Sequence, residues 1–349
     1  MQAPKPSPVG SSPAADGDVT RFEAAEVSDK AWFNRTRTVL FVNGMLNSPE
    51  DHSKSATGLS VLQCCPVIGV YNRSDGFWQD LGQCITDKAK LVGVQAEVGL
   101  NFQNWVRAVD ALYQDAKANR PGLTKVAFVG DMISSNKATH ALFSLIAGAG
   151  GLEKPTIYSH SQGNLIVSNA LTAVALAQGP AAINGIEVNS FGSPCRYWPQ
   201  GVKRTNYAFT FDPVSWLDLR TDLTSSKIGF VAAHGFDVYL KHDAEFIVNR
   251  FRWGSFGMTV SLDEVGLAAF MVRMGNNPRR LKAILERLYK AHWSDSDDVA
   301  LLYVRSVSDA DLRSLKFSDP SVIDLLIQAL ETGWTTADEK AAIDRLRAL

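Results

Sequence analysis

A serine flanked by small residues stands where a short apolar segment meets a longer one. Residues 156–159 read Thr-Ile-Tyr-Ser, residues 160–163 read His-Ser-Gln-Gly, and an apolar run continues to Gln178. The first segment predicts a buried strand, and the second, apolar nearly all round, predicts a buried helix. A serine on a sharp strand-to-helix turn, with small residues two positions before and after it, is typical of a nucleophile elbow. We therefore predict that Ser161 is a catalytic nucleophile.

A serine nucleophile needs a base, because its hydroxyl is almost wholly protonated at neutral pH. Two downstream residues each follow a predicted strand, Asp212 first and then His234. The order Ser, Asp, His is one of the orders in which catalytic triads occur along a chain. We expect His234 to take the serine proton, and Asp212 to hold the imidazole in the required tautomer.

Other titratable residues compete for these roles. His242 is the alternative base, and Asp218 is the alternative acid. His160, beside the nucleophile, is expected to point away from it and to support the structure. His52 is expected to be solvated, on a helix that begins with Ser48 and a proline.

Further motifs follow the predicted strands in a consistent order. Asn43-Gly44 follows residues 38–42, Phe-Gly-Ser-Pro occupies 191–194, and Asp-Pro-Val occupies 212–214. Together with the elbow, these motifs resemble the α/β-hydrolase superfamily, and more loosely its lipase and esterase branches, over about residues 36–245. The superfamily often has His where Asn43 stands.

The resemblance implies a reaction class and an oxyanion hole. The backbone N–H groups of Met45 and Gln162 are expected to donate to the developing oxyanion, so the side chain of Asn43 is expected to matter less. Removing one such donor typically costs about 3–4 kcal/mol of transition-state stabilisation. The reaction is expected to be cleavage of carboxyl esters, of lipids or phospholipids among others, through an acyl-enzyme.

The arrangement of segments predicts the fold class. Short apolar runs alternate with amphipathic ones from about 36 to 250, which is typical of βα units in a mostly parallel sheet with flanking helices. The predicted strands are 38–42, 67–71, 126–129, 156–159, 186–190, 207–211 and 228–232.

Composition divides the chain into three parts. Residues 1–24, rich in Pro, Ser, Ala and Gly, predict a disordered tail. Residues 25–252 are the predicted α/β-hydrolase catalytic domain, and 253–349 a C-terminal helical module that offers a surface for a protein or a membrane. Two segments beginning at Trp293 and Trp334 resemble each other and predict similarly capped helices. Residues 265–271 are either a cap over the site or a core helix of this module.

Composition also excludes several classes of protein. The 349 residues carry a net charge of −1, so nucleic acid is not the expected partner. No apolar run reaches the length of a membrane-spanning helix, and no general secretory signal is recognised. No metal-ligand spacing or phosphate-binding glycine loop occurs, so no metal or cofactor is expected. The four cysteines, at 64, 65, 84 and 195, are expected to be buried free thiols.

Ester hydrolysis is the prediction, and other functions use the same residues. An acyltransferase or peptidase would use the same triad, and a binding protein would keep the scaffold without turnover. Aromatic residues after the motifs favour an apolar substrate: Tyr197, Trp198, Trp216, Phe236 and Tyr239. The expected location is the cytoplasm, with export by a specialised secretion system as the alternative.

Overall fold

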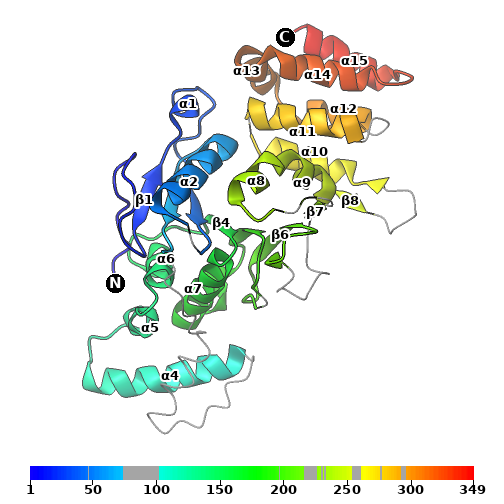
Figure 1. Ribbon diagram of the computed structural model, residues 1–349. Coiled ribbons are helices and arrows are strands. Elements are labelled where there is room, and N and C mark those ends of the chain that lie inside the picture. The colour runs from blue at the N-terminus through cyan, green and yellow to red at the C-terminus, as the bar shows by residue number, and fades with distance from the viewer. Residues whose placement is uncertain are drawn as a thin grey trace.

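A computed structural model of the chain describes residues 1–45, 47–73, 102–195, 197–215, 226–228, 231, 233–253, 261–275, 277–291 and 296–349. The fold is α/β, with a mostly parallel seven-stranded sheet between helices (Figure 1). The strands are β1 (Val19–Phe22), β2 (Val39–Val42), β3 (Val67–Val70), β4 (Thr156–His160), β5 (Glu187–Phe191), β6 (Lys203–Phe209) and β7 (Ser226–Ile228). Their order is β1-β3-β2-β4-β5-β6-β7, and only β1 runs antiparallel to its neighbour.

Alternating side chains of the buried strands serve two separate cores. In β2, Leu40 and Val42 face one core, and Val39 and Phe41 face the other. The first core is completed by helices α4 (Phe102–Asn119), α5 (Lys125–Ile133), α6 (Lys137–Ala147) and α7 (Gly163–Gln178). The second is completed by α2 (Pro49–Gln63), α8 (Phe236–Lys241) and α9 (Asp243–Arg250). Helices therefore cover both faces of the sheet, as parallel strands require. The short α1 (Ala25–Ser28) and the 3₁₀ helix η1 (Pro180–Ile183) lie in the connections.

The strand order reverses between β2 and β4. From β2 the chain passes through α2 to β3 on one side, and from β4 it passes through α7 to β5 on the other. Ligands of open α/β sheets bind outside the carboxyl ends of the strands at such a reversal. Residues after Val42 and after His160 therefore occupy the favoured place for a site.

The remaining helices share a third core. They are α10 (Glu264–Arg273), α11 (Pro278–Ala291), α12 (Ser296–Ser306), α13 (Asp309–Ser318), α14 (Pro320–Leu330) and α15 (Ala337–Arg347). Figure 1 shows them stacked at one end of the molecule, with α4 at the other. Leu267 and Met271 of α10 are fully buried in this third core, so residues 265–271 form a core helix. A small antiparallel pair, β8 (Arg252–Trp253) and β9 (Ser261–Leu262), precedes α10.

Two predicted elements differ in the structure. Residues 126–129 lie in α5 and form no strand, because the Thr124 side chain caps a helix by accepting from the Ala127 N–H. The predicted disordered tail is wrong for β1, whose Val19 and Phe22 are buried. Cross-strand pairing with β3 orders this segment despite its composition. Among the described helices, none is long and apolar enough to cross a membrane.

Candidate active site

Ser161 lies on the turn between β4 and α7 in a strained backbone conformation. Its φ is +53°, in the left-handed region that residues other than glycine rarely adopt. The turn is held by the Ser161 N–H, which donates to the Phe191 carbonyl over 2.9 Å. A Cβ added to Gly163 would lie 2.5 Å from the Val42 carbonyl oxygen, which explains the small residue there. The backbone at Ser161 therefore has the geometry of the predicted elbow.

Asn164 supports this turn and was not anticipated from the sequence. Its amide Nδ2 donates to the carbonyls of Ser161 (2.8 Å) and Phe191 (3.1 Å). Its Oδ1 accepts from the Ser159 hydroxyl over 2.7 Å, entirely within the core. The Asn164 amide thus links Ser159 and Ser161 of the elbow to Phe191 at the end of β5.

His234 bridges Ser161 and Asp212. Its Nε2 is 2.8 Å from Ser161 Oγ, and its Nδ1 is 2.8 and 2.9 Å from the two carboxylate oxygens of Asp212. Asp212 is fully buried, and the side chain of His234 is 30% exposed. The predicted base is therefore partly open to solvent, while the predicted acid is not.

The carboxylate of Asp212 is further held by Tyr239 and by the Val214 N–H. The Tyr239 hydroxyl donates over 2.6 Å and the N–H over 2.9 Å. Burial raises the pKa of Asp212, but the hydrogen bonds from His234 and Tyr239 outweigh it, so the pKa lies below its ordinary value. Asp212 is consequently ionised at neutral pH, as an orienting acid must be.

His160 packs against His234, the predicted base. Its Nε2 donates to the backbone carbonyl of His234 over 2.5 Å, and the two rings lie 4.7 Å apart between centroids. Burial, and then the neighbouring His234, lower the pKa of His160 to about 3, so its ring is neutral. The expected structural role is consistent with this contact, although the ring lies against His234 and is not turned away from the site.

The alternative base lies elsewhere. His242 Nδ1 is 3.2 Å from Glu245 Oε2, between α8 and α9, and the structure brings His234 to Ser161 in its place. Asp218, the alternative acid, lies outside the described residues, as do Trp216 and Trp293.

The loop after β2 approaches the serine closely. A Cβ added to Gly44 would lie 2.6 Å from Ser161 Cβ and 3.2 Å from its Oγ. The N–H groups of Met45 and Gln162 have no acceptor within the part of the chain that the structure describes. Among the described residues, therefore, nothing occupies these two donors before a ligand binds.

A buried network positions this loop, and the sequence reasoning missed it. The Asn43 amide donates to the carbonyls of Gly44 and Asn72, and its Oδ1 accepts from the Asn72 N–H, each over 2.8 Å. His52 Nδ1 also lies 2.8 Å from Asn43 Oδ1, and Asn72 Nδ2 donates to Gln162 Oε1 over 3.2 Å. The side chain of Asn43 therefore joins the two loops that carry Met45 and Gln162, contrary to the expectation that it matters less.

The expectation of a solvated His52 is also wrong. The residue is fully buried, and burial lowers its pKa to about 3, so the ring is a neutral donor to Asn43. Its helix packs on the sheet, and Gly69 of β3 leaves room for the ring: a Cβ there would lie 2.3 Å from Nε2.

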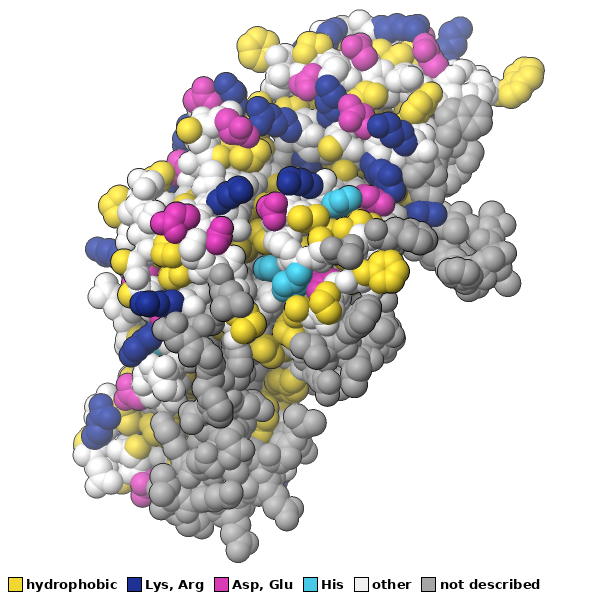
Figure 2. Space-filling model, viewed as in Figure 1, with side chains coloured by type: hydrophobic (Ala, Val, Ile, Leu, Met, Phe, Trp, Pro, Cys, Tyr) yellow, Lys and Arg dark blue, Asp and Glu magenta, His cyan; other side chains and the backbone are white. Residues whose placement is uncertain are grey.

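The aromatic residues expected around a substrate pocket are placed differently. Phe236 and Tyr239 are buried in the core beneath the triad. Tyr197 packs against Trp105, and Trp198 lies beneath the guanidinium of Arg204. The exposed apolar side chains nearest in sequence to the site residues are Met45 (46%) and Phe211 (47%). Figure 2 shows histidine atoms reaching the surface in the middle of one face, beside hydrophobic side chains.

The described residues contain no group of three or more His, Cys, Asp or Glu side chains that would hold a metal ion. Cys64, Cys65 and Cys195 are buried and form no disulfide within the described part of the chain, and Cys84 lies outside that part. No protein-family model, no curated protein and no solved structure matches the chain.

Proposed function

We propose that the chain is a serine hydrolase of the α/β-hydrolase type that cleaves carboxyl esters through an acyl-enzyme. The observation that carries the proposal is the bridge of His234 between Ser161 and Asp212, with 2.8 Å to Oγ and 2.8 Å to the nearer carboxylate oxygen. The three residues follow three different strands, β4, β6 and β7. The positive φ of Ser161 supports it independently, since strain of this kind is found at nucleophile elbows.

In the proposed mechanism, Ser161 Oγ attacks the ester carbonyl carbon while its proton passes to His234 Nε2. Asp212 stabilises the imidazolium that results. The tetrahedral intermediate collapses as His234 gives the proton to the leaving alcohol, which leaves an acyl group on Ser161. Water then repeats the sequence, with His234 as its base, and releases the acid.

The oxyanion of the intermediate is proposed to accept hydrogen bonds from the N–H groups of Met45 and Gln162. Preorganisation of such donors is usually the largest electrostatic contribution to acyl transfer. The buried network of His52, Asn43 and Asn72 supports this assignment because it limits the movement of one donor loop relative to the other.

An apolar acyl or alcohol group is the proposed substrate feature. Met45, whose N–H is a proposed oxyanion donor, and Phe211, which precedes the proposed acid, both expose large apolar side chains. An ester with an apolar chain would cover part of this surface, at about 25 cal/mol for each Å² removed from water.

The test is labelling with a fluorophosphonate, read by intact mass, on the wild type and on Ser161→Ala. The probe reports an activated serine without knowledge of the substrate. We expect one adduct on the wild type and none on the variant. Ser318→Ala is a matched control, because the exposed Ser318 hydroxyl on α13 donates only to the Ser314 carbonyl of its own helix, and it should label like the wild type. A folded wild type that takes no adduct would contradict the proposal and favour a binding protein.

A further inference from the structure

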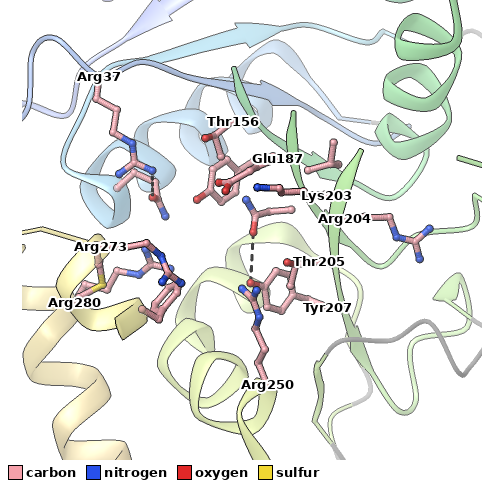
Figure 3. Close-up of a pocket in the computed structure, with 16 residues that line it drawn as sticks. Arg37, Thr156, Glu187, Lys203, Arg204, Thr205, Tyr207, Arg250, Arg273 and Arg280 are labelled. Carbon is pink, nitrogen blue, oxygen red and sulfur yellow. Dashed lines mark hydrogen bonds between the residues drawn. The ribbon is translucent and has the colours of Figure 1, made fainter. Parts of the chain in front are cut away.

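A second cleft lies at the opposite end of the sheet from Ser161. It has a volume of about 460 Å³, within the range of small-molecule sites. It begins at the amino ends of β4, β5 and β6, marked by Thr156, Glu187 and Lys203 (Figure 3). Thr156 and Ser161 are separated by the length of β4, roughly 16 Å of extended chain. The cleft is therefore separate from the proposed active site.

The floor and walls of the cleft come from different parts of the chain. Strand residues of one sheet face form the floor with hydroxyl and amide groups: Thr156, Tyr158, Asn189, Thr205 and Tyr207. Helices α9, α10 and α11 supply Arg250, Arg273 and Arg280, and Arg37 enters from the segment before β2. Figure 3 shows Arg37 on one side and these three arginines on the other. A ligand here would touch the sheet and the C-terminal helices together.

The lining carries an excess of positive charge. Six basic residues and one acidic residue line the cleft. Arg280 is neutralised by a bidentate pair with Asp243, at 2.8 and 3.0 Å, and Arg204 extends away toward Trp198 (Figure 3). Arg37, Lys203, Arg250 and Arg273 then share the lining with the single carboxylate of Glu187. None of these four is within ion-pair distance of a carboxylate among the described residues.

A buried amide N–H group in the same lining lacks an acceptor among the described residues. Gln63 is 5% exposed, and its Nε2 makes no hydrogen bond, while its Oε1 accepts weakly from Arg37 over 3.4 Å. A buried donor without an acceptor costs about 1–3 kcal/mol, so such groups usually await a ligand or water. The cleft therefore offers the Gln63 N–H group and several guanidinium groups as donors to a ligand.

We infer that this cleft binds a small organic phosphate. A phosphate ester supplies several acceptor oxygens and negative charge, and guanidinium groups recognise it in a bidentate manner. The size of the cleft leaves room for an organic body beside the phosphate, over the hydroxyl-lined floor and Phe270. The inference does not depend on serine chemistry, because none of the lining residues belongs to the proposed triad or oxyanion hole.

The experiment is calorimetric titration of the full chain, at constant ionic strength, with inositol hexakisphosphate, inorganic phosphate and citrate. Ser161→Ala serves as the parent and should bind like the wild type, which separates this site from the proposed function. We expect inositol hexakisphosphate to bind, and Arg273→Gln and Gln63→Leu each to weaken it about tenfold, the value of one hydrogen bond to a charged group. Arg313→Gln, which removes one exposed charge on α13, is the matched control and should bind normally.

Three results would overturn the inference. If Arg313→Gln weakened the binding of inositol hexakisphosphate as much as Arg273→Gln, the binding would depend on the overall surface charge and not on a specific site. If citrate bound as tightly as inositol hexakisphosphate, the cleft would have no preference for phosphate. If neither bound, the cleft would not be an anion-binding site. Vesicles with phosphatidylinositol bisphosphate, compared with phosphatidylserine vesicles, identify the source: sedimentation that Arg273→Gln abolishes supports a lipid headgroup, and soluble binding without sedimentation supports a free phosphate.

Discussion

The Tyr239 hydroxyl donates to Oδ2 of Asp212 over 2.6 Å, and both residues are fully buried. Tyr239 lies on α8, the helix that begins two residues after His234, so one short segment supplies both the proposed base and a second donor to the proposed acid. Burial and the adjacent carboxylate raise the pKa of Tyr239, which keeps it a donor at every physiological pH.

We predict that Tyr239→Phe lowers kcat/KM about tenfold and the stability at pH 7 by about 1–2 kcal/mol, the value of one buried hydrogen bond. The folded pKa of Asp212 is lowered, so its ionised form stabilises the protein above the ordinary carboxyl pKa, and this contribution is lost as the pH falls through the folded pKa. Wild type and variant should therefore converge in stability at the acid end of a urea-unfolding series. An unchanged kcat/KM would show that Asp212 orients His234 without the hydrogen bond from Tyr239.

The two candidate bases are separated by paired substitutions. His234→Ala should reduce kcat by about 10⁴-fold or more, because it removes the base of a triad. His242→Ala should change kcat by less than about threefold, since His242 contacts Glu245 and not Ser161. Ester hydrolysis followed over time measures both, and the reverse ranking would move the base to His242.

Gly44→Ala tests the approach of the proposed oxyanion loop to the nucleophile. The new Cβ would lie 2.6 Å from Ser161 Cβ, so the loop must retreat from the serine. A misplacement of this order costs about 100-fold in kcat. Gly122→Ala is the control, because no atom lies within 4 Å of its added Cβ, and it should remain fully active. Equal activity of the two variants would count against the oxyanion assignment.

The buried His52 predicts a pH dependence of stability. Its pKa is lowered from 6.5 to about 3, so the unfolded chain binds a proton between these values that the folded chain does not. The unfolded state thus holds more protons in this window, and stability falls as the pH falls, by about 1.4 kcal/mol for each pH unit. His52→Gln should flatten the slope by that amount in urea unfolding from pH 6 to 4. An unaltered slope would mean that His52 is protonated in the folded state.

Phe22→Ala tests whether the N-terminal segment is part of the fold. Phe22 of β1 is 4% exposed and contacts the ring of His52, so truncation should cost about 3–5 kcal/mol. Phe317→Ala removes a ring that is 90% exposed and should cost less than about 0.5 kcal/mol. Thermal unfolding measures both. Equal losses of stability in the two variants would support the disordered tail that composition predicts.

The sequence was sufficient for features that depend on local order. Small residues around Ser161, an apolar strand before it and an apolar helix after it define the elbow, because backbone strain at one residue needs only its neighbours. The order of the predicted strands also placed Asp212 after β6 and His234 after β7. These residues meet because parallel strands bring their carboxyl ends to one edge of the sheet. The α/β class followed from the same alternation.

Only the tertiary structure decided the contacts between distant segments. The hydrogen bonds that connect Asn43 to Gln162 through Asn72 join three loops. A buried amide leaves no pattern in the sequence from which its partners could be predicted. β1 is ordered by pairing with β3, about fifty residues further along the chain, which outweighs its local composition. Residues 126–129 have the β-branched content of a strand, but the Thr124 cap and the apolar face of α5 against the core favour the helix. The arginines of the second cleft are spread from Arg37 to Arg280, and packing of α9–α11 beside the sheet alone brings them together.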